Sequence, residues 1–135
     1  MAEKPLLTLE DAKRIAAAAQ AEALRNDWRV VIAVVDDGGH LLYLQRSHET
    51  QFGSIETAIQ KAHAAVAFQR PTKVSEDAVL SGRLIHLALP GVIPAEGGVP
   101  LQIEGVIVGG LGISGVRSSQ DGQIAAAGAA ALAGA

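Results

Sequence analysis

The chain has 135 residues, a formal net charge of −3, no cysteine, and aromatic residues at only 3% of positions. This length predicts one domain over residues 1–135. The small number of aromatic residues predicts an aliphatic core, and the lack of cysteine excludes disulfides. The slight acidity argues against nucleic-acid binding, which needs a basic face. Because the N-terminus lacks a signal-peptide core and no segment is apolar enough to cross a membrane, we expect a soluble cytoplasmic protein.

The first part of the chain predicts a helix followed by a hairpin. Thr8–Asp11 has the pattern of a capping box, and apolar residues at helical spacing continue to about Asn26. The branched run within Arg29–Asp36 is typical of a strand buried on both faces. The turn Asp36–Gly39 and the alternating segment His40–Arg46 then complete an antiparallel pair of strands.

The second part adds two helices, another hairpin and a last helix. An apolar stripe over Ile55–Val66 predicts a long helix, and Ser75 can cap a short one. A tight turn at Glu104-Gly105 predicts a hairpin whose second strand ends at Ser114. Ser118–Asp121 resembles a second capping box. If the apolar segment Arg83–Leu89 forms a strand, the fold class is α+β, with an antiparallel sheet of about five strands flanked by helices.

Glycine is concentrated in the second strand of this last hairpin. Gly110, Gly112 and Ser114 share one face, and glycine inside a strand indicates that something approaches its backbone closely. Two interpretations stay open, since either a ligand or the backbone of a packed helix would need this space.

A ligand at this face would find polar groups nearby. The N–H groups of consecutive glycines can bind an anionic oxygen, and a lysine beside the apolar helix stripe can supply positive charge. That lysine can equally extend its ammonium group to solvent from a structural position. The predicted ligand-binding residues are therefore Lys61, Glu96, Gly97, Gly98 and Ser114, with Asp36 added from the first hairpin. The alternative role of Asp36 is turn hydrogen bonding.

Histidine spacing does not indicate a protein-built metal site. The four histidines, none of them spaced as H-x-x-x-H or H-x-H, are His40, His48, His63 and His86. We therefore predict no metal held by side chains alone. His40 and His63 lie next to the motifs described below and are the candidate haem ligands.

Six motifs, in matching order and spacing, resemble the GlcG/HbpS-like family, also called the haem-degrading-domain family. The C-terminal domains of PduO-type proteins are similar. The motifs lie in Leu7–Ala12, Val31–Leu41, Gly53–Ala62, Phe68–Thr72, Leu89–Pro100 and Val108–Gly115. The resemblance implies a five-stranded antiparallel sheet with flanking helices, assembled as dimers or larger oligomers. It also implies a relation to haem, which some members bind or degrade.

Three functions remain open from the sequence. The first is a small-ligand-binding accessory protein, possible ligands including haem. The second is an enzyme acting on a small polar carboxylate or aldehyde metabolite, with Lys61, Glu96 and Asp36 as acid–base groups. The third is a structural or regulatory oligomer without a ligand. With so few aromatic residues, we expect haem binding to be weak. Alanine-rich first and last helices with apolar residues on more than one face predict at least a homodimer.

Overall fold

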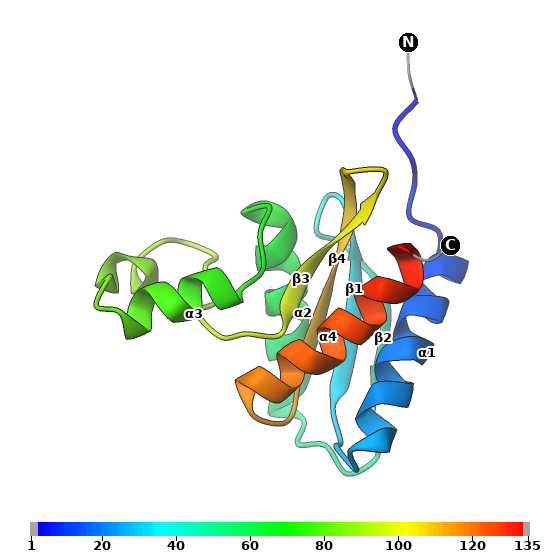
Figure 1. The fold of residues 1–135 in the computed structure, drawn as a ribbon, viewed down its shortest axis with the longest axis horizontal. Helices are drawn as coiled ribbons and strands as arrows, with labels where there is room; N and C mark the ends of the chain where they lie inside the picture. Colours follow the sequence, from blue (N-terminus) through cyan, green and yellow to red (C-terminus); the bar gives the residue numbers. More distant parts are fainter. Residues whose placement is uncertain (1–2, 134–135) are drawn as a thin grey trace.

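One antiparallel sheet of four strands organises the fold, with helices on both of its faces (Figure 1). The structure is a computed structural model that describes residues 3–133. Its elements are α1 (Leu9–Arg25), β1 (Val31–Asp36), β2 (Leu41–Arg46), α2 (Gly53–Ala67), α3 (Lys73–Leu80), the 3₁₀ helix η1 (Leu84–Leu87), β3 (Gly98–Ile103), β4 (Val106–Ser114) and α4 (Ser118–Ala133). None of these helices is long and apolar enough to span a membrane.

The strand order β2-β1-β4-β3 places the two most buried strands in the centre of the sheet. Val31 to Val35 of β1 are all buried, as the branched run predicts. The α+β class and the antiparallel pairing are confirmed, but the number of about five strands is wrong. Residues 84–87 form a 3₁₀ helix, since this segment lies away from the sheet and has no strand edge to pair with.

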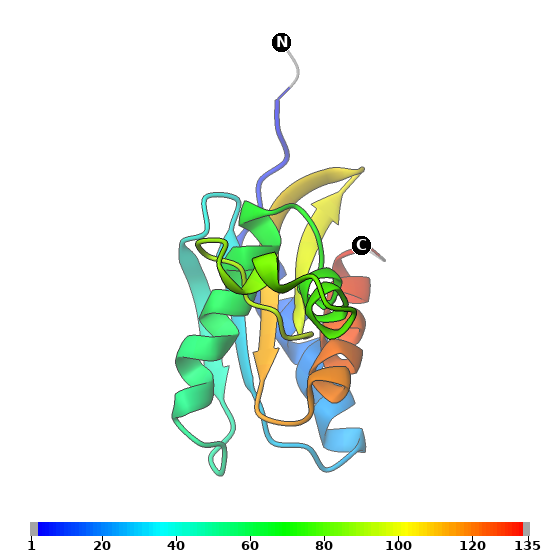
Figure 2. The same cartoon turned by 90° about the vertical axis from the view of Figure 1, so that its left-hand side faces the viewer.

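Figure 2 shows the sheet between α2 on one side and α1 with α4 on the other. The residues of β1 alternate between these two layers. Ile32 and Val34 belong to the large apolar cluster beneath α1 and α4, while Val31 and Ala33 pack with Ala58 of α2. The capping box at Thr8 is confirmed, because Asp11 N–H donates to its hydroxyl over 3.0 Å and Thr8 N–H donates to the Asp11 carboxylate.

The glycine face of β4 is occupied by α2. A Cβ on Gly112 would lie 1.9 Å from the carbonyl oxygen of Ala58, and one on Gly110 would lie 2.4 Å from that of Ala62. Helix packing therefore explains these glycines. The interpretation of this face as an open ligand surface is wrong, because the helix backbone fills the space.

The arm, which we define as residues 73–89 with α3 and η1, projects away from the sheet (Figure 1). Inside the arm, His86 Nδ1 lies 3.1 Å from the Ser75 hydroxyl, and both residues are buried. At its base, Gly98 N–H donates to the Thr72 hydroxyl over 2.9 Å. These bonds fix the arm to the start of β3 and close its two short helices on each other.

Candidate functional site

A buried ion pair joins the helices on the two faces of the sheet. Lys61 of α2 is 2% exposed, and its Nζ donates to the carbonyl oxygen of Ile113 over 2.9 Å. The same Nζ lies 3.0 Å from Oδ2 of Asp121 in the first turn of α4. The ammonium group is therefore enclosed, and Lys61 does not extend to solvent.

Asp121 is the member of this cluster that sequence reasoning missed. Its Oδ1 accepts a hydrogen bond from Val116 N–H over 3.2 Å, while Oδ2 faces Lys61. The predicted capping box with Ser118 is wrong, because the helix already begins at Ser118 and the carboxylate is turned toward the lysine. Burial raises the pKa of Asp121 to about 6, against the opposing effects of the Lys61 charge and hydrogen bonds.

Two glycines at the start of β3 close the space around the lysine. Gly97 has a φ of +132°, and a Cβ there would lie 2.9 Å from Lys61 Nζ. A Cβ on Gly98 would lie 2.3 Å from the Lys61 carbonyl oxygen. Since Gly98 N–H already donates to Thr72, it is not free to bind an anion as the sequence suggested.

Glu96 lies at the edge of the same cluster. Its backbone N–H donates to Oε1 of Glu76 on α3 over 3.0 Å. Its carboxylate packs on α4 so closely that a Cβ on Gly122 would lie 1.8 Å from Oε2. Burial raises the pKa of Glu96; the charges of Lys73 and Lys61 oppose this rise, and those of Glu76 and Asp77 add to it.

The structure thus brings four of the six predicted ligand residues together: Lys61, Glu96, Gly97 and Gly98. Ser114 is buried at the end of β4, opposite Val31. Asp36 lies at the other end of β1, paired with Gly109, and is not part of the cluster. That these residues bind a ligand stays a prediction.

Asp36 instead organises the β1–β2 turn. Its Oδ1 accepts hydrogen bonds from the N–H groups of Gly38 and His40, each over 2.9 Å, and lies 3.2 Å from His40 Nδ1. Turn hydrogen bonding, the alternative role of Asp36, is therefore confirmed. Burial on its own would raise the pKa of Asp36, but the hydrogen bonds from His40 and Gly38 and the nearby imidazole outweigh it and lower the pKa.

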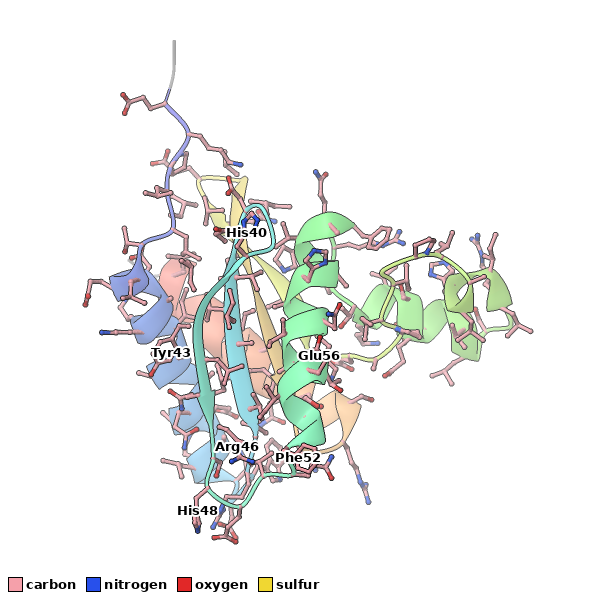
Figure 3. All side chains as sticks on the ribbon, turned by 180° about the vertical axis from the view of Figure 1, so that it is seen from behind. His40, Tyr43, Arg46, His48, Phe52 and Glu56 are labelled. Atoms are coloured by element: carbon pink, nitrogen blue, oxygen red, sulfur yellow. The ribbon has the colours of Figure 1, made fainter. Side chains whose placement is uncertain are left out.

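A shallow cleft of about 140 Å³ lies between this turn and the last part of α2. It is lined by Asp37, Gly38, Gly39, His63, Val66 and Ala67. The His63 ring is exposed, as the sequence predicts, and lies so close to the turn that a Cβ on Gly39 would be 2.5 Å from its Cδ2. Figure 3 shows His40 at the same tip of the hairpin, with Arg46 and His48 at the far end of β2.

No group of three or more His, Cys, Asp or Glu side chains within residues 3–133 is arranged to hold a metal ion. The polar groups around the cleft are the imidazoles of His40 and His63 and the carboxylates of Asp36 and Asp37.

Several known proteins resemble this chain in sequence or in fold. The chain is similar to protein GlcG of Escherichia coli (strain K12), with 42% identity over 114 residues that cover 84% of this chain and 85% of GlcG. A crystal structure of a PduOC:heme complex superposes with a TM-score of 0.83, 33% identity, and coverage of 95% of this chain and 96% of that one. The HbpS crystal structure superposes with a TM-score of 0.86, 33% identity, and coverage of 98% and 94%.

A family model described as "Haem degrading protein HbpS-like" matches residues 7–130, nearly the whole of the region that the structure describes. This match agrees with the GlcG similarity and with the two superposed structures. The chain belongs to the HbpS-like family.

Proposed function

We propose that this protein is a small-ligand-binding accessory protein whose ligand is haem or a related metalloporphyrin. The observation that carries the proposal is the PduOC:heme complex, a protein 33% identical to this chain over 95% of its length. A haem ligand also agrees with the family to which the chain belongs.

The cleft beside His63 is the site that the geometry supports best. Its histidine is exposed, and the side chains of Val66 and Ala67 give it an apolar wall. Imidazole is a common axial ligand of haem iron. A cleft of about 140 Å³ is smaller than the roughly 300–1,000 Å³ of typical ligand pockets, so a porphyrin would stay partly exposed. Binding to a single chain would accordingly be weak.

His40 is the second histidine suited to iron. The hydrogen bond to Asp36 places the proton on Nδ1, so Nε2 carries the free lone pair. The His40 ring lies near the cleft, since a Cβ on Gly38 would be 2.9 Å from Nδ1. Asp36 would then act on the ligand through His40, in the way that carboxylates orient metal-bound histidines.

A hemin titration tests this assignment. The wild type should give a Soret shift. His63→Ala should weaken binding by about tenfold or more, because losing an iron ligand should cost at least as much as losing an outer-shell partner of one, which costs roughly 10–100-fold. His40→Ala should have a smaller effect. The matched control is His48→Ala, since His48 is an exposed histidine at the opposite end of β2 and should leave binding unchanged. Equal binding by all three variants would place the ligand elsewhere.

An enzyme is the second candidate, and one observation favours it. Glu96 is a carboxyl group whose pKa is raised by burial and which lies in the electrostatic range of Lys61, as a general acid requires. Glu96→Gln is the test variant. If wild type converts a small hydroxyacid or aldehyde from a screening panel and a folded Glu96→Gln protein does not, this candidate is supported. A panel without turnover counts against it.

A further inference from the structure

A second, smaller cavity lies between the end of α2, the start of α3 and the loop before β3. Its lining combines apolar side chains with one cation and two hydroxyl groups, and includes Phe68, Arg70, Thr72, Ser75, Val92 and Ile93. The cavity has a volume of about 10 Å³, which is room for one water-sized group. It opens to solvent, because Arg70, Val92 and Ile93 are each partly exposed.

The guanidinium group of Arg70 lacks the partner that its surroundings require. Its Nε is buried and has no hydrogen-bond partner in the part of the chain that the structure describes. Two arginines within residues 3–133 are half-buried, and the other one, Arg29, pairs with Asp27 over 2.6 Å. Because buried polar groups in native proteins are nearly always hydrogen-bonded, Arg70 indicates a partner from outside the chain.

The surrounding structure already holds Arg70 in place. Gln69 has a φ of +57°, and the N–H of Arg70 donates to the carbonyl oxygen of Ala65 over 3.2 Å, so α2 ends in a left-handed turn just before the arginine. The Cζ atom of Arg70 lies 5.9 Å from the centroid of the Phe68 ring, which is within cation–π range. A ligand would therefore bind a side chain that is ordered in advance, and this reduces the entropy cost of binding.

We propose that this cavity binds a short-chain monocarboxylate, whose carboxylate group pairs with Arg70. The planar guanidinium offers parallel N–H donors that match the two oxygens of a carboxylate. No acidic side chain is among the described residues that line the cavity, so none competes for the cation. One carboxylate oxygen fits the water-sized space, and Val92 and Ile93 can contact a short alkyl group at the opening. A second negative charge on the ligand would lie against this apolar wall without a cation of its own.

The cleft beside His63 does not suit the same ligand. The described residues that line it include the carboxylate of Asp37 and neither a lysine nor an arginine, so an anion would be repelled there. No residue lines both spaces. The carboxylate site is therefore independent of haem binding, and either proposal can fail without the other.

Ser75 can supply a second hydrogen bond to the ligand. Its hydroxyl oxygen lies 3.1 Å from Nδ1 of His86, and both residues are buried. When Nδ1 carries a proton, it donates to the serine oxygen, and the hydroxyl proton is left for a carboxylate in the cavity that Ser75 lines. When Nδ1 is unprotonated, the hydroxyl donates to the imidazole instead. Carboxylate binding should therefore favour the form of His86 with the proton on Nδ1.

A nitrogen-15 NMR titration with sodium acetate tests the site. The wild type should show saturable shifts of the backbone N–H signals of Arg70 and Ser75 at millimolar acetate, the affinity range expected of so small a ligand. Acetamide, an uncharged molecule of nearly the same shape, should give no such shifts. Sodium chloride at equal concentration should give smaller ones, because it lacks the second oxygen. Absence of saturation with acetate, or equal shifts with acetamide or chloride, would overturn the inference.

Replacing the arginine separates a specific site from general ion effects. Arg70→Met should weaken acetate binding by about tenfold or more, because the charge-assisted hydrogen bonds are lost. The matched control is Arg83→Met, since Arg83 is an exposed arginine of the arm that does not line the cavity. Both variants should keep the wild-type circular dichroism spectrum. Equal acetate affinities of Arg70→Met and wild type would show that the cation does not bind the ligand.

The side-chain nitrogen signals of His86 give a readout that depends on where the carboxylate lies. At constant pH, acetate should increase the fraction of His86 with the proton on Nδ1 in the wild type and leave this fraction unchanged in Ser75→Ala. Ser75→Ala keeps Arg70 and should weaken acetate binding only about threefold to tenfold, the cost of one neutral hydrogen bond. Unchanged His86 signals in acetate-saturated wild type would contradict a carboxylate placed between Arg70 and Ser75.

Discussion

Asp121 and Asp36 each accept hydrogen bonds and lie beside a nitrogen-bearing side chain, but one is in the interior and the other is at a turn on the surface. Asp121 is 2% exposed and pairs with Lys61 in the interior, whereas Asp36 lies at a turn beside the exposed His40. Burial raises the pKa of Asp121 to about 6. Burial also acts to raise the pKa of Asp36, but the backbone and imidazole hydrogen bonds outweigh this effect, and the pKa is lowered. The balance between desolvation and hydrogen bonds decides the sign.

The two aspartates mark two regions of the molecule that differ in solvent access. The interior cluster has little access for a ligand, and its ion pair holds α2, β4 and α4 together. The turn offers an imidazole nitrogen to solvent next to a cleft. The predicted residues therefore divide into a buried group around Lys61 and an exposed group around His63, where we propose that the ligand binds.

Removing the buried cation should have the largest effect. Lys61→Met leaves the Asp121 carboxylate buried without its partner, and breaking a buried pair costs roughly 3–5 kcal/mol of unfolding free energy. Urea denaturation at pH 7 measures this loss. Lys73→Met is the matched control, because Lys73 pairs with Asp77 over 2.7 Å with both side chains more than half exposed. Such a pair contributes about 0.3–0.5 kcal/mol.

An equal effect of the two lysine substitutions would show that the interior pair is solvated in solution. The structural assignment of Lys61 would then fail, and the lysine would be free to act in the predicted ligand site.

The pH dependence of stability should show the next largest effect. A folded-state pKa of about 6 against an ordinary value of 3.8 means that the folded protein binds the Asp121 proton more tightly than the unfolded chain. The resulting stabilisation is present below pH 3.8 and is lost as the pH rises to about 6. The shift corresponds to about 3 kcal/mol, since one pKa unit is roughly 1.4 kcal/mol.

Asp121→Asn isolates this contribution. Between pH 4 and 6 the unfolding free energy of the wild type should fall relative to that of the variant, and above pH 7 the difference should be constant. A carbon-13 titration of the side-chain carboxyl should give a midpoint near 6 for Asp121 and a midpoint below the ordinary range for Asp36. Parallel stability curves over this range would contradict the prediction.

The sequence predicts the fold wherever one local pattern has one structural meaning. The branched residues of β1 and the capping box at Thr8 are of this kind, and both are confirmed. Arg83–Leu89 is not, because a short apolar segment can be a strand or a turn. Its structure depends on whether a strand edge is within reach, and the arm carries it away from the sheet.

The candidate site was harder to predict for a similar reason. Gly110 and Gly112 indicate that another group approaches the strand backbone closely, but a ligand and a helix backbone both require glycine at such positions. The pairing of Lys61 with Asp121 spans 60 residues, and no local pattern marks it. An acidic residue is also favourable in the first turn of a helix, so the sequence pattern around Asp121 is explained without a buried partner and does not indicate Lys61.

The smallest effect on stability is expected at Asp36, where asparagine can replace aspartate without loss of the turn. The amide oxygen of Asp36→Asn can accept the same N–H groups of Gly38 and His40, so unfolding free energy should change by less than about 0.5 kcal/mol. Asp36→Ala removes the oxygen that accepts both hydrogen bonds and should cost about 1–2 kcal/mol. Nitrogen-15 spectra should show His40 protonated on Nδ1 in the wild type and less strongly so in Asp36→Asn, which lacks the negative charge. If the wild-type proton is on Nε2 instead, Asp36 does not orient this histidine, and His63 of α2 is the candidate haem ligand that remains beside the cleft.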